Sequence, residues 1–294
     1  MNNREKTVQG TVVKAYGGYF YVRSATRLWA CASRGRFRYE KQEVLVGDQV
    51  EMLPRSKDAG LIVKVLPRYS RLTRPPVTNV DQVVLVFSLR QPDPNSGLLD
   101  RMLIAADINR IDPLICFNKL DLSRDDDLQL PARYQDLYPV VLASTVTGVG
   151  LDLLRQYLQG KLTVLAGPSG VGKSTILNAL MPDLRLKTGD ISHKLKRGRH
   201  TTRHVELIAL SDGGLVADTP GFSSLDLPDM KTEELAAYFP EMEQYQGQCR
   251  FNGCLHDQEP GCAIKEALPD GVIEPSRYQQ YIEFLHELKG RRRY

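Results

Sequence analysis

Residues 167–174 read Gly-Pro-Ser-Gly-Val-Gly-Lys-Ser, and this stretch decides the fold class of the chain. It follows the apolar run 162–165 and leads into a helical pattern over residues 175–180. At a strand–loop–helix junction of this kind, glycines let backbone N–H groups turn inward around phosphate oxygens. The sequence therefore predicts a nucleotide-phosphate loop formed by Gly167, Pro168, Ser169, Gly170, Val171, Gly172, Lys173, Ser174 and Thr175.

Two polar side chains of this loop have expected roles. Lys173 is expected to reach the β- and γ-phosphates of the nucleotide, which makes it a candidate catalytic residue. The Ser174 hydroxyl is expected to bind Mg²⁺. A glycine-rich turn without a ligand is the alternative, and the flanking strand and helix patterns argue against it.

Apolar runs on both sides of this loop indicate a parallel sheet. Residues 83–87, 114–117, 140–142 and 215–217 are continuously apolar, as in strands that are buried on both faces. Helical periodicity separates them, most clearly over residues 98–109. The alternation predicts an α/β fold with crossover helices.

The sequence Asn-Lys-Leu-Asp at 118–121 follows one of these predicted strands. The Asp121 carboxylate can accept hydrogen bonds from N1–H and the N2 amine of guanine, a donor pair that adenine lacks. Asn118 is expected to brace the loop, and the stem of Lys119 is expected to cover the base beside Leu120. Ser144 and Thr145 follow another predicted strand and are expected to form a second guanine-contacting loop.

Further along the chain, Asp-Thr-Pro-Gly at 218–221 directly follows the apolar run 215–217. Asp218 can hold Mg²⁺, and the N–H of Gly221 can donate to the γ-phosphate. The run Gly-Arg-His-Thr-Thr at 198–202 offers a threonine to complete the Mg²⁺ shell. Spacing does not separate Thr201 from Thr202, and we assign Thr202.

The order of these motifs is unusual. Residues 118–121 and 144–145 precede the phosphate loop, whereas ordinary small GTPases begin with that loop. The set therefore resembles a circularly permuted GTPase, with the usual termini joined through residues 159–161. The new break lies just after Gly221.

The residue after Gly221 is Phe222, where Ras-like enzymes carry a water-orienting glutamine. A phenyl group cannot hydrogen-bond water, so intrinsic hydrolysis is expected to be slow. His200 is the candidate that orients the attacking water. A surface histidine or an RNA contact is the alternative for this residue.

Three of the five cysteines fall within fourteen residues and share their segment with a histidine. Cys249, Cys254, His256 and Cys262 offer three thiolates and an imidazole, a donor set typical of structural zinc. All four positions of a tetrahedral ion would be filled, which leaves none for catalysis. Cys31 and Cys116 lie in apolar runs and are interpreted as core residues.

The N-terminal region is basic and rich in β-forming runs. Residues 1–75 hold fifteen Lys/Arg and six Asp/Glu, a net charge of +9, whereas the whole chain carries +4. About five short predicted strands, one of them at 44–50, suit a small OB-fold barrel. The expected RNA contacts are Arg34, Arg36 and Arg38 around Phe37; a core Phe37 with solvated arginines is the alternative.

Three modules follow from these patterns: an all-β OB-fold barrel at residues 1–72, a permuted P-loop GTPase domain at 73–227, and a helical zinc-binding module at 228–294. Residues 71–76 are interpreted as a linker, and helices are predicted at 232–239 and 275–290. The chain lacks a long apolar run or signal-peptide pattern, so a cytoplasmic protein without a membrane partner is expected. We also expect it to be a monomer.

In this combination of barrel, permuted motifs and cysteine–histidine cluster, the chain resembles the ribosome small-subunit-dependent GTPase A family of bacteria. The resemblance covers nearly all residues. It implies a late assembly factor for the small ribosomal subunit that binds ribosomal RNA and GTP or GDP and is stimulated by the subunit. Arg203 departs from the threonine that many members carry there, which bears on the choice between Thr201 and Thr202.

Two other classes of function share some of these features. Guanylate kinases have a similar phosphate loop, but they need a second nucleotide site and a lid, for which the chain has no pattern. A non-catalytic RNA-binding protein that only senses GTP is compatible with Phe222. Turnover measured with and without small subunits separates the three classes.

Overall fold

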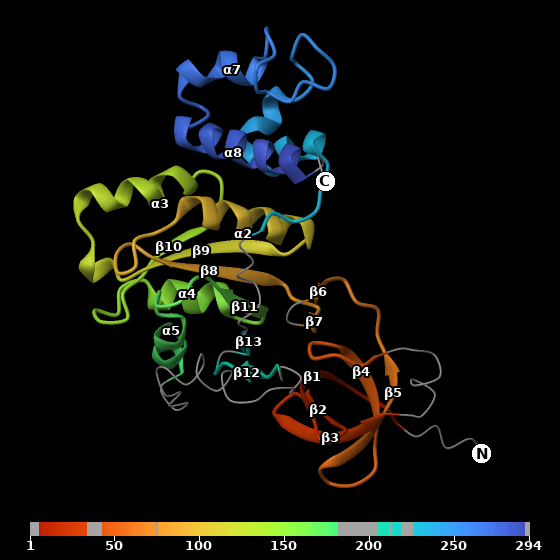
Figure 1. Cartoon of the computed structure of the whole chain (residues 1–294). Coiled ribbons are helices and arrows are strands. Elements are labelled where there is room, and N and C mark those ends of the chain that lie inside the picture. Colours follow the sequence, from red (N-terminus) through yellow and green to blue (C-terminus); the bar gives the residue numbers. More distant parts are fainter. Residues whose placement is uncertain are drawn as a thin grey trace.

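The computed structural model describes residues 6–33, 43–73, 76–181, 205–211, 213–218 and 226–291. Within these ranges, a closed barrel, a six-stranded sheet and a helical C-terminal module follow one another along the chain (Figure 1). His200, Thr201, Thr202, Gly221, Phe222, Arg34, Arg36, Phe37 and Arg38 lie outside the described residues.

The barrel contains five strands in the order β1-β2-β3-β5-β4, and pairing of β1 with β4 closes it. They are β1 (Val8–Tyr16), β2 (Tyr19–Ser24), β3 (Arg27–Ser33), β4 (Gln49–Pro54) and β5 (Ala59–Val65). Alternate apolar side chains such as Val12, Val22 and Ile62 point inward and are fully buried. The expected all-β barrel is confirmed.

The predicted strand at 44–50 was placed too early, because β4 begins only at Gln49. Val44 packs in the barrel core, and Val46 is buried at the junction with the next domain, where it forms a β-bridge to Val77. The expected linker is also structured, as β6 (Arg71–Thr73) pairs with β7 (Pro76–Thr78). The buried Asp48 carboxylate accepts hydrogen bonds from Arg68 and Thr78 and ties this junction together.

The central sheet has the order β10-β9-β8-β11-β13-β12. Its strands are β8 (Gln82–Ser88), β9 (Asp112–Asn118), β10 (Val140–Leu142), β11 (Leu162–Ala166), β12 (Leu207–Ala209) and β13 (Leu215–Asp218). Every residue of β8 and β11 is buried, which explains why both sequences are mostly apolar, and the buried Gln82 and Thr163 hydrogen-bond to each other. All neighbouring pairs are parallel except β12 with β13.

Helices cover both faces of the sheet (Figure 1). Leucines and methionine of α2 (Ser96–Ile108) pack with one face, beside α3 (Gln129–Tyr134). Leucines and isoleucine of α4 (Leu151–Leu158) and α5 (Lys173–Leu180) pack with the other. Two 3₁₀ turns, η1 (Leu120–Leu122) and η2 (Asp125–Leu128), connect β9 to α3.

The C-terminal module docks on α2 rather than hanging free (Figure 1). It comprises η3 (Thr232–Tyr238), η4 (Pro240–Tyr245), α7 (Ala263–Ala267), η5 (Leu268–Asp270) and α8 (Pro275–Arg291). The helix predicted at 232–239 is a 3₁₀ helix, whereas the longer predicted helix is confirmed as α8. Ile104 of α2 belongs to the apolar core of this module.

The barrel also contacts the sheet directly. Lys14 of β1 forms a β-bridge with Glu206, and its Nζ lies 2.8 Å from the Glu206 carboxylate. Val13 of the barrel and Leu207 of β12 share one apolar core. In the described ranges, no helix is both long and apolar enough to span a membrane.

Candidate nucleotide-binding and metal sites

The predicted nucleotide motifs meet at one edge of the central sheet. Because β8, β9, β10, β11 and β13 run parallel, their carboxyl ends open at the same edge. Asn118 pairs with Ser88 at the end of β8, and Asp218 pairs with Leu165 at the end of β11. The permuted motif order therefore leads to a single common site.

The phosphate loop follows β11 and caps α5. Gly167, Gly170 and Gly172 all have positive φ values, of 141°, 83° and 96°. These backbone conformations curl the loop, and Lys173 folds over it to donate hydrogen bonds to the carbonyls of Gly167 and Pro168, at 2.8 and 2.7 Å. The loop has the form of an anion cradle at a helix N-terminus.

Asn118 connects the base-recognition loop to the phosphate loop. Its Nδ2 donates to the Val171 carbonyl at 2.9 Å, and the residue is fully buried. A Cβ at Gly172 would collide with this Nδ2 atom, so the glycine is needed for the contact as well as for its positive φ. The Asn118 Oδ1 atom is buried and finds no partner among the described residues, which leaves an unused acceptor in the site.

Asp121 and Ser144 meet as predicted for two guanine-contacting loops. The Ser144 Oγ donates to Asp121 Oδ1 at 2.5 Å and accepts from the N–H groups of Val146 and Thr147, each at 3.2 Å. Asp121 is exposed, whereas Ser144 is buried. The carboxylate is thus held at one oxygen and open to a ligand.

Lys119 lies in the left-handed region, with φ of 63°. Its Nζ donates to the carbonyls of Gly170, at 2.7 Å, and of Gln91. The side chain therefore spans from the base-recognition loop to the phosphate loop, and its stem can cover a base as predicted. The Leu120 N–H, in turn, donates to the Ala143 carbonyl and fixes this loop against the Ser144 loop.

The structure thus brings together Asn118, Lys119, Leu120, Asp121, Ser144, Thr145 and the residues 167–175. Asp218 ends β13 beside Leu165, in a position consistent with its prediction, but only its backbone is described. The predictions for His200, Thr202, Gly221 and the three barrel arginines fall outside the described residues.

The four predicted metal ligands form a compact cluster. One ligand atom each from Cys249, Cys254, His256 and Cys262 lies within 4.8 Å of the others. The His256 Nδ1 atom is 3.5 Å from the Cys249 sulfur and 3.4 Å from the Cys262 sulfur, and the two sulfurs are 3.9 Å apart. A tetrahedral ion with metal–sulfur bonds of about 2.3 Å has ligand edges near these values.

Helix α8 supports this cluster through hydrogen bonds to its backbone. The Tyr278 hydroxyl donates to the His256 carbonyl at 2.7 Å, and the Tyr281 hydroxyl donates to the Leu255 carbonyl at 2.8 Å. Burial raises the pKa of the Cys254 thiol to about 12 and lowers the pKa of His256. Without a metal, the thiol is therefore neutral at pH 7.

Two known protein families match most of this chain. Residues 65–228 match the RsgA GTPase family, and residues 9–62 match the RsgA N-terminal domain. The chain belongs to the RsgA GTPase family.

A relative from Moorella thermoacetica, named small ribosomal subunit biogenesis GTPase RsgA, is 49% identical over 97% of this chain and 99% of its own. A relative of the same name from Carboxydothermus hydrogenoformans is 47% identical over 96% of this chain and 98% of its own.

Solved structures agree with this assignment. YjeQ from Thermotoga maritima superposes with a TM-score of 0.86 at 39% identity, covering 97% of this chain and 99% of that one. YloQ, described as a circularly permuted GTPase, superposes with a TM-score of 0.82 at 40% identity, covering 99% and 98%. This chain is therefore a GTPase with the permuted fold that its motif order predicted.

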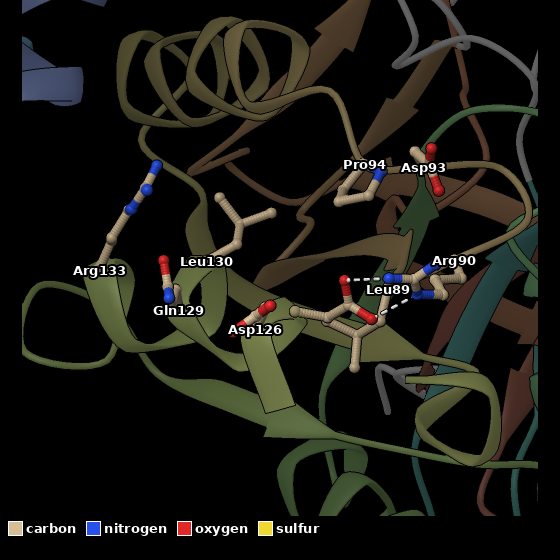
Figure 2. A pocket seen from close by; sticks show the side chains of 9 residues that line it. Leu89, Arg90, Asp93, Pro94, Asp126, Gln129, Leu130 and Arg133 are labelled. Carbon is tan, nitrogen blue, oxygen red and sulfur yellow. Dashed lines mark hydrogen bonds and ion pairs between the residues drawn. The ribbon is translucent and has the colours of Figure 1, made fainter. Parts of the chain in front are cut away.

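Sequence reasoning missed one feature beside the site of this RsgA GTPase. A cleft of about 270 Å³ separates the loop after β8 from the segment that contains η2 and α3 (Figure 2). Its lining residues are Leu89, Arg90, Asp93, Pro94, Asp126, Asp127, Gln129, Leu130 and Arg133. Arg90 bridges it by donating to both oxygens of Asp127, at 2.5 and 3.1 Å. No sequence motif marks these residues. The neighbouring Gln91 accepts a hydrogen bond from Lys119 through its backbone carbonyl, not its side chain.

Proposed function

We propose that this GTPase acts in the assembly of the small ribosomal subunit, binding the subunit and its RNA and hydrolysing GTP to GDP and phosphate. The contact between Asn118 and Val171 carries the nucleotide part of the proposal, because it joins the base and phosphate loops into one pocket. The names of the relatives from Moorella and Carboxydothermus support the biological part.

Guanine recognition is assigned to the loops after β9 and β10. The free oxygen of Asp121 accepts from the guanine N1–H and N2 groups, and Ser144 keeps the carboxylate oriented. The stem of Lys119 covers the base. Asn118, Leu120 and Thr145 complete the pocket.

Phosphate and magnesium binding is assigned to residues 167–175 and the end of β13. The backbone N–H groups of the curled loop hold the phosphates, and Lys173 exchanges its two carbonyl partners for phosphate oxygens. Ser174, Asp218 and Thr202 hold Mg²⁺, and the Gly221 N–H donates to the γ-phosphate. The chain thus contains the donors that a Mg²⁺–GTP complex requires.

Hydrolysis transfers the γ-phosphoryl group to water, and the bond from the γ-phosphorus to the β–γ bridging oxygen breaks. Lys173 stabilises the charge that develops on the phosphoryl oxygens. Since Phe222 cannot orient water, His200 is proposed to hold the attacking water once the subunit is bound. Slow intrinsic turnover with stimulation by the subunit follows from this division of roles.

The Cys₃His cluster is proposed to bind one structural zinc ion. Its donor set and its nearly tetrahedral spacing match zinc, and all four coordination positions are filled by the protein. The zinc closes a loop with few apolar residues, so metal binding and folding of that loop are coupled.

The basic barrel is proposed to bind ribosomal RNA through Arg34, Arg36 and Arg38. The proposed modules are residues 1–72, 73–227 and 228–294, and the protein is proposed to act as a cytoplasmic monomer. The barrel contacts β12 through Lys14 and Glu206, so RNA binding and nucleotide binding occur on touching parts of the molecule.

One experiment tests the proposal directly. Steady-state GTP hydrolysis is measured with purified protein alone, with small subunits and with large subunits. Slow turnover that rises only with small subunits is expected. Rapid transfer of phosphate to a nucleoside monophosphate would indicate a kinase, and binding of GTP without turnover under any condition would indicate a sensor.

A further inference from the structure

A buried charge cluster joins the C-terminal module to the GTPase domain. Arg277 of α8 donates through Nε to Glu241 of η4 at 2.7 Å and through Nη1 to Asp100 of α2. The hydroxyl of Tyr134, on α3, donates to the same Asp100 oxygen at 2.8 Å. The exposed fraction of Arg277 is 3%, and those of Asp100 and Tyr134 are 2% and 1%.

In this cluster the single guanidinium of Arg277 lies between two carboxylates, Asp100 and Glu241, and burial raises the pKa of the Asp100 carboxyl. Burial lowers the pKa of the Arg277 guanidinium, but the carboxylates of Asp100 and Glu241 outweigh it and keep the pKa above its ordinary value. Arg277 also lies over the rings of Phe239 and Tyr134, at 4.7 and 5.3 Å. A buried guanidinium with fixed partners tolerates few other arrangements, because any shift leaves a charge unpaired.

Tyr134 ends the segment that carries guanine recognition. Asp121 lies in η1, from which the chain passes through η2 directly into α3. Two local hydrogen bonds hold this path: Ser123 donates to the Leu120 carbonyl, and the Arg124 N–H donates to Asp127. The position of α3 therefore limits where residues 118–121 can lie.

On the side that faces the loop after β8, two side-chain contacts hold this segment: the hydrogen bond from Lys119 to the Gln91 carbonyl and the ion pair of Arg90 with Asp127. The cleft in Figure 2 lies there, and among the residues that line it the Arg90–Asp127 ion pair is the contact that spans the gap. A further contact connects α3 to the start of α8: the Nη1 atom of Arg133 lies 3.1 Å from the Oγ atom of Ser276. Helix α3 is thus also held in position by a contact with the C-terminal module.

We infer that Arg277, acting through Asp100 and Tyr134, positions the guanine-recognition segment, so that the C-terminal module sets guanine-nucleotide affinity. The inference rests on the proposed guanine pocket. Arg277 is a positioning residue, because it does not contact the nucleotide. By reciprocity, a bound guanine nucleotide stabilises the docking of α8 on the GTPase domain.

The chain offers a matched control for this role. Arg101 of α2 also pairs with a carboxylate of α8, Glu287 at 2.6 Å, and also lies over an aromatic ring of α8, Phe284 at 4.5 Å. Both of these contacts connect Arg101 to α8, and neither involves α3. Arg101→Met therefore weakens docking of the module without releasing the guanine-recognition segment.

The test compares Tyr134→Phe, Arg277→Met and Arg101→Met with the wild type, using equilibrium binding of fluorescent GDP and a GTP analogue. Tyr134→Phe is expected to raise both Kd values about threefold and Arg277→Met about tenfold, by the same factor for the two nucleotides. The kcat at saturating GTP should stay unchanged, and Arg101→Met should leave both Kd values within about twofold.

Hydrogen exchange gives a second readout that does not depend on activity. GDP should slow exchange of α8 amides in the wild type and do so less in Tyr134→Phe. If Arg277→Met fails to fold, Tyr134→Phe decides the matter, since it removes one hydroxyl and keeps the ion pairs. Unchanged Kd values in folded Tyr134→Phe, or an equal loss in Arg101→Met, would overturn the inference. A wild type without guanine-nucleotide binding would instead refute the proposed function.

Discussion

The side-chain amide of Asn118 donates a hydrogen bond to the carbonyl of Val171, 2.9 Å away, across 53 residues of sequence. Asn118 belongs to the base-recognition loop and Val171 to the phosphate loop. Their contact shows why motif order is free to vary: the pocket depends on which strands are neighbours and not on which is made first. Replacing residues of either loop therefore tests the pocket.

Asp121→Asn should change base preference. The amide removes an acceptor for guanine and offers a donor to the 2-oxo group of xanthine, so Kd for GDP should rise between about tenfold and a hundredfold while xanthosine diphosphate binds better. Competition binding with both nucleotides measures this. Asp125→Asn, which alters an exposed carboxylate in η2, is the control and should bind like the wild type. Unaltered GDP affinity in Asp121→Asn would disprove the base-pocket assignment.

Lys173→Ala and Ser174→Ala should each reduce turnover at least about a hundredfold, because they remove a phosphate contact or a Mg²⁺ ligand. Lys173 donates hydrogen bonds to the Gly167 and Pro168 carbonyls of its own loop, so its replacement should lower the unfolding free energy by about 1 to 2 kcal/mol. Single-turnover hydrolysis and thermal unfolding measure the two effects. Full activity in either variant would exclude the proposed phosphate loop.

Cys249→Ser should lose zinc and loosen residues 240–265, because the metal-ligand bonds close this polar loop. Native protein should contain one zinc ion per chain by elemental analysis. Cys31→Ala is the matched control, since Cys31 lies in the barrel core, and it should retain the metal. Natively purified wild type without metal would contradict the prediction.

Zinc affinity should also fall as pH falls. In the metal-free protein, burial raises the pKa of Cys254 to about 12 and also raises that of Cys262, so zinc must displace thiol protons at pH 7. Calorimetric zinc titration in buffers of different ionisation enthalpy should report proton release, with an affinity that rises with pH. An affinity independent of pH between 6 and 8 would exclude thiolate ligation.

Replacing Arg34, Arg36 and Arg38 together by alanine should weaken small-subunit binding and lower the slope of log K against log salt by about two to three units. Three phosphate contacts account for that change. A triple alanine variant at Arg110, Arg124 and Lys231 removes equal charge outside the barrel and controls for net charge. An unchanged slope in the barrel variant would place the RNA contact elsewhere.

Nucleotide state should control small-subunit binding. A contact between Gly221 and the γ-phosphate can act on the chain that leads from Asp218 to the C-terminal module, so a non-hydrolysable GTP analogue should favour subunit binding over GDP by at least about fivefold. Sedimentation with small subunits in each nucleotide measures this, and turnover should rise on adding subunits. Equal binding in both states and no stimulation would leave the nucleotide without a signalling role.

Local sequence was sufficient for much of the fold, and it predicted a nucleotide pocket whose loops lie together in the structure. Continuous apolar runs identified β8 and β11, and glycine spacing identified the phosphate loop, because each pattern has one strong physical cause. The start of β4 was predicted too early because the apolar residues before it have more than one physical cause. Val44 is apolar for packing in the barrel core and Val46 for packing beside Val77 at the junction, and strand propensity does not distinguish such burial from a strand.

Docking of the C-terminal module on α2 was also not predicted. The residues that bury a charge pair at this interface, Arg277 and Asp100, lie 177 residues apart in sequence. The lone Asp100 within the apolar pattern of α2 was the available signal, since an uncompensated carboxylate there would be unfavourable. Its partner could not be found without the tertiary structure.

The pairing of β8 with β11 has a consequence for synthesis on the ribosome. Gln82 of β8 donates to Thr163 of β11 at 2.8 Å, so the centre of the sheet joins residues 81 positions apart. The barrel, by contrast, is complete within residues 8–65. In a nascent chain the barrel can fold while the sheet still lacks its middle, and guanine nucleotide has no pocket until β11 and its loop have emerged. Synthesis from the N-terminus therefore completes the barrel before the nucleotide pocket.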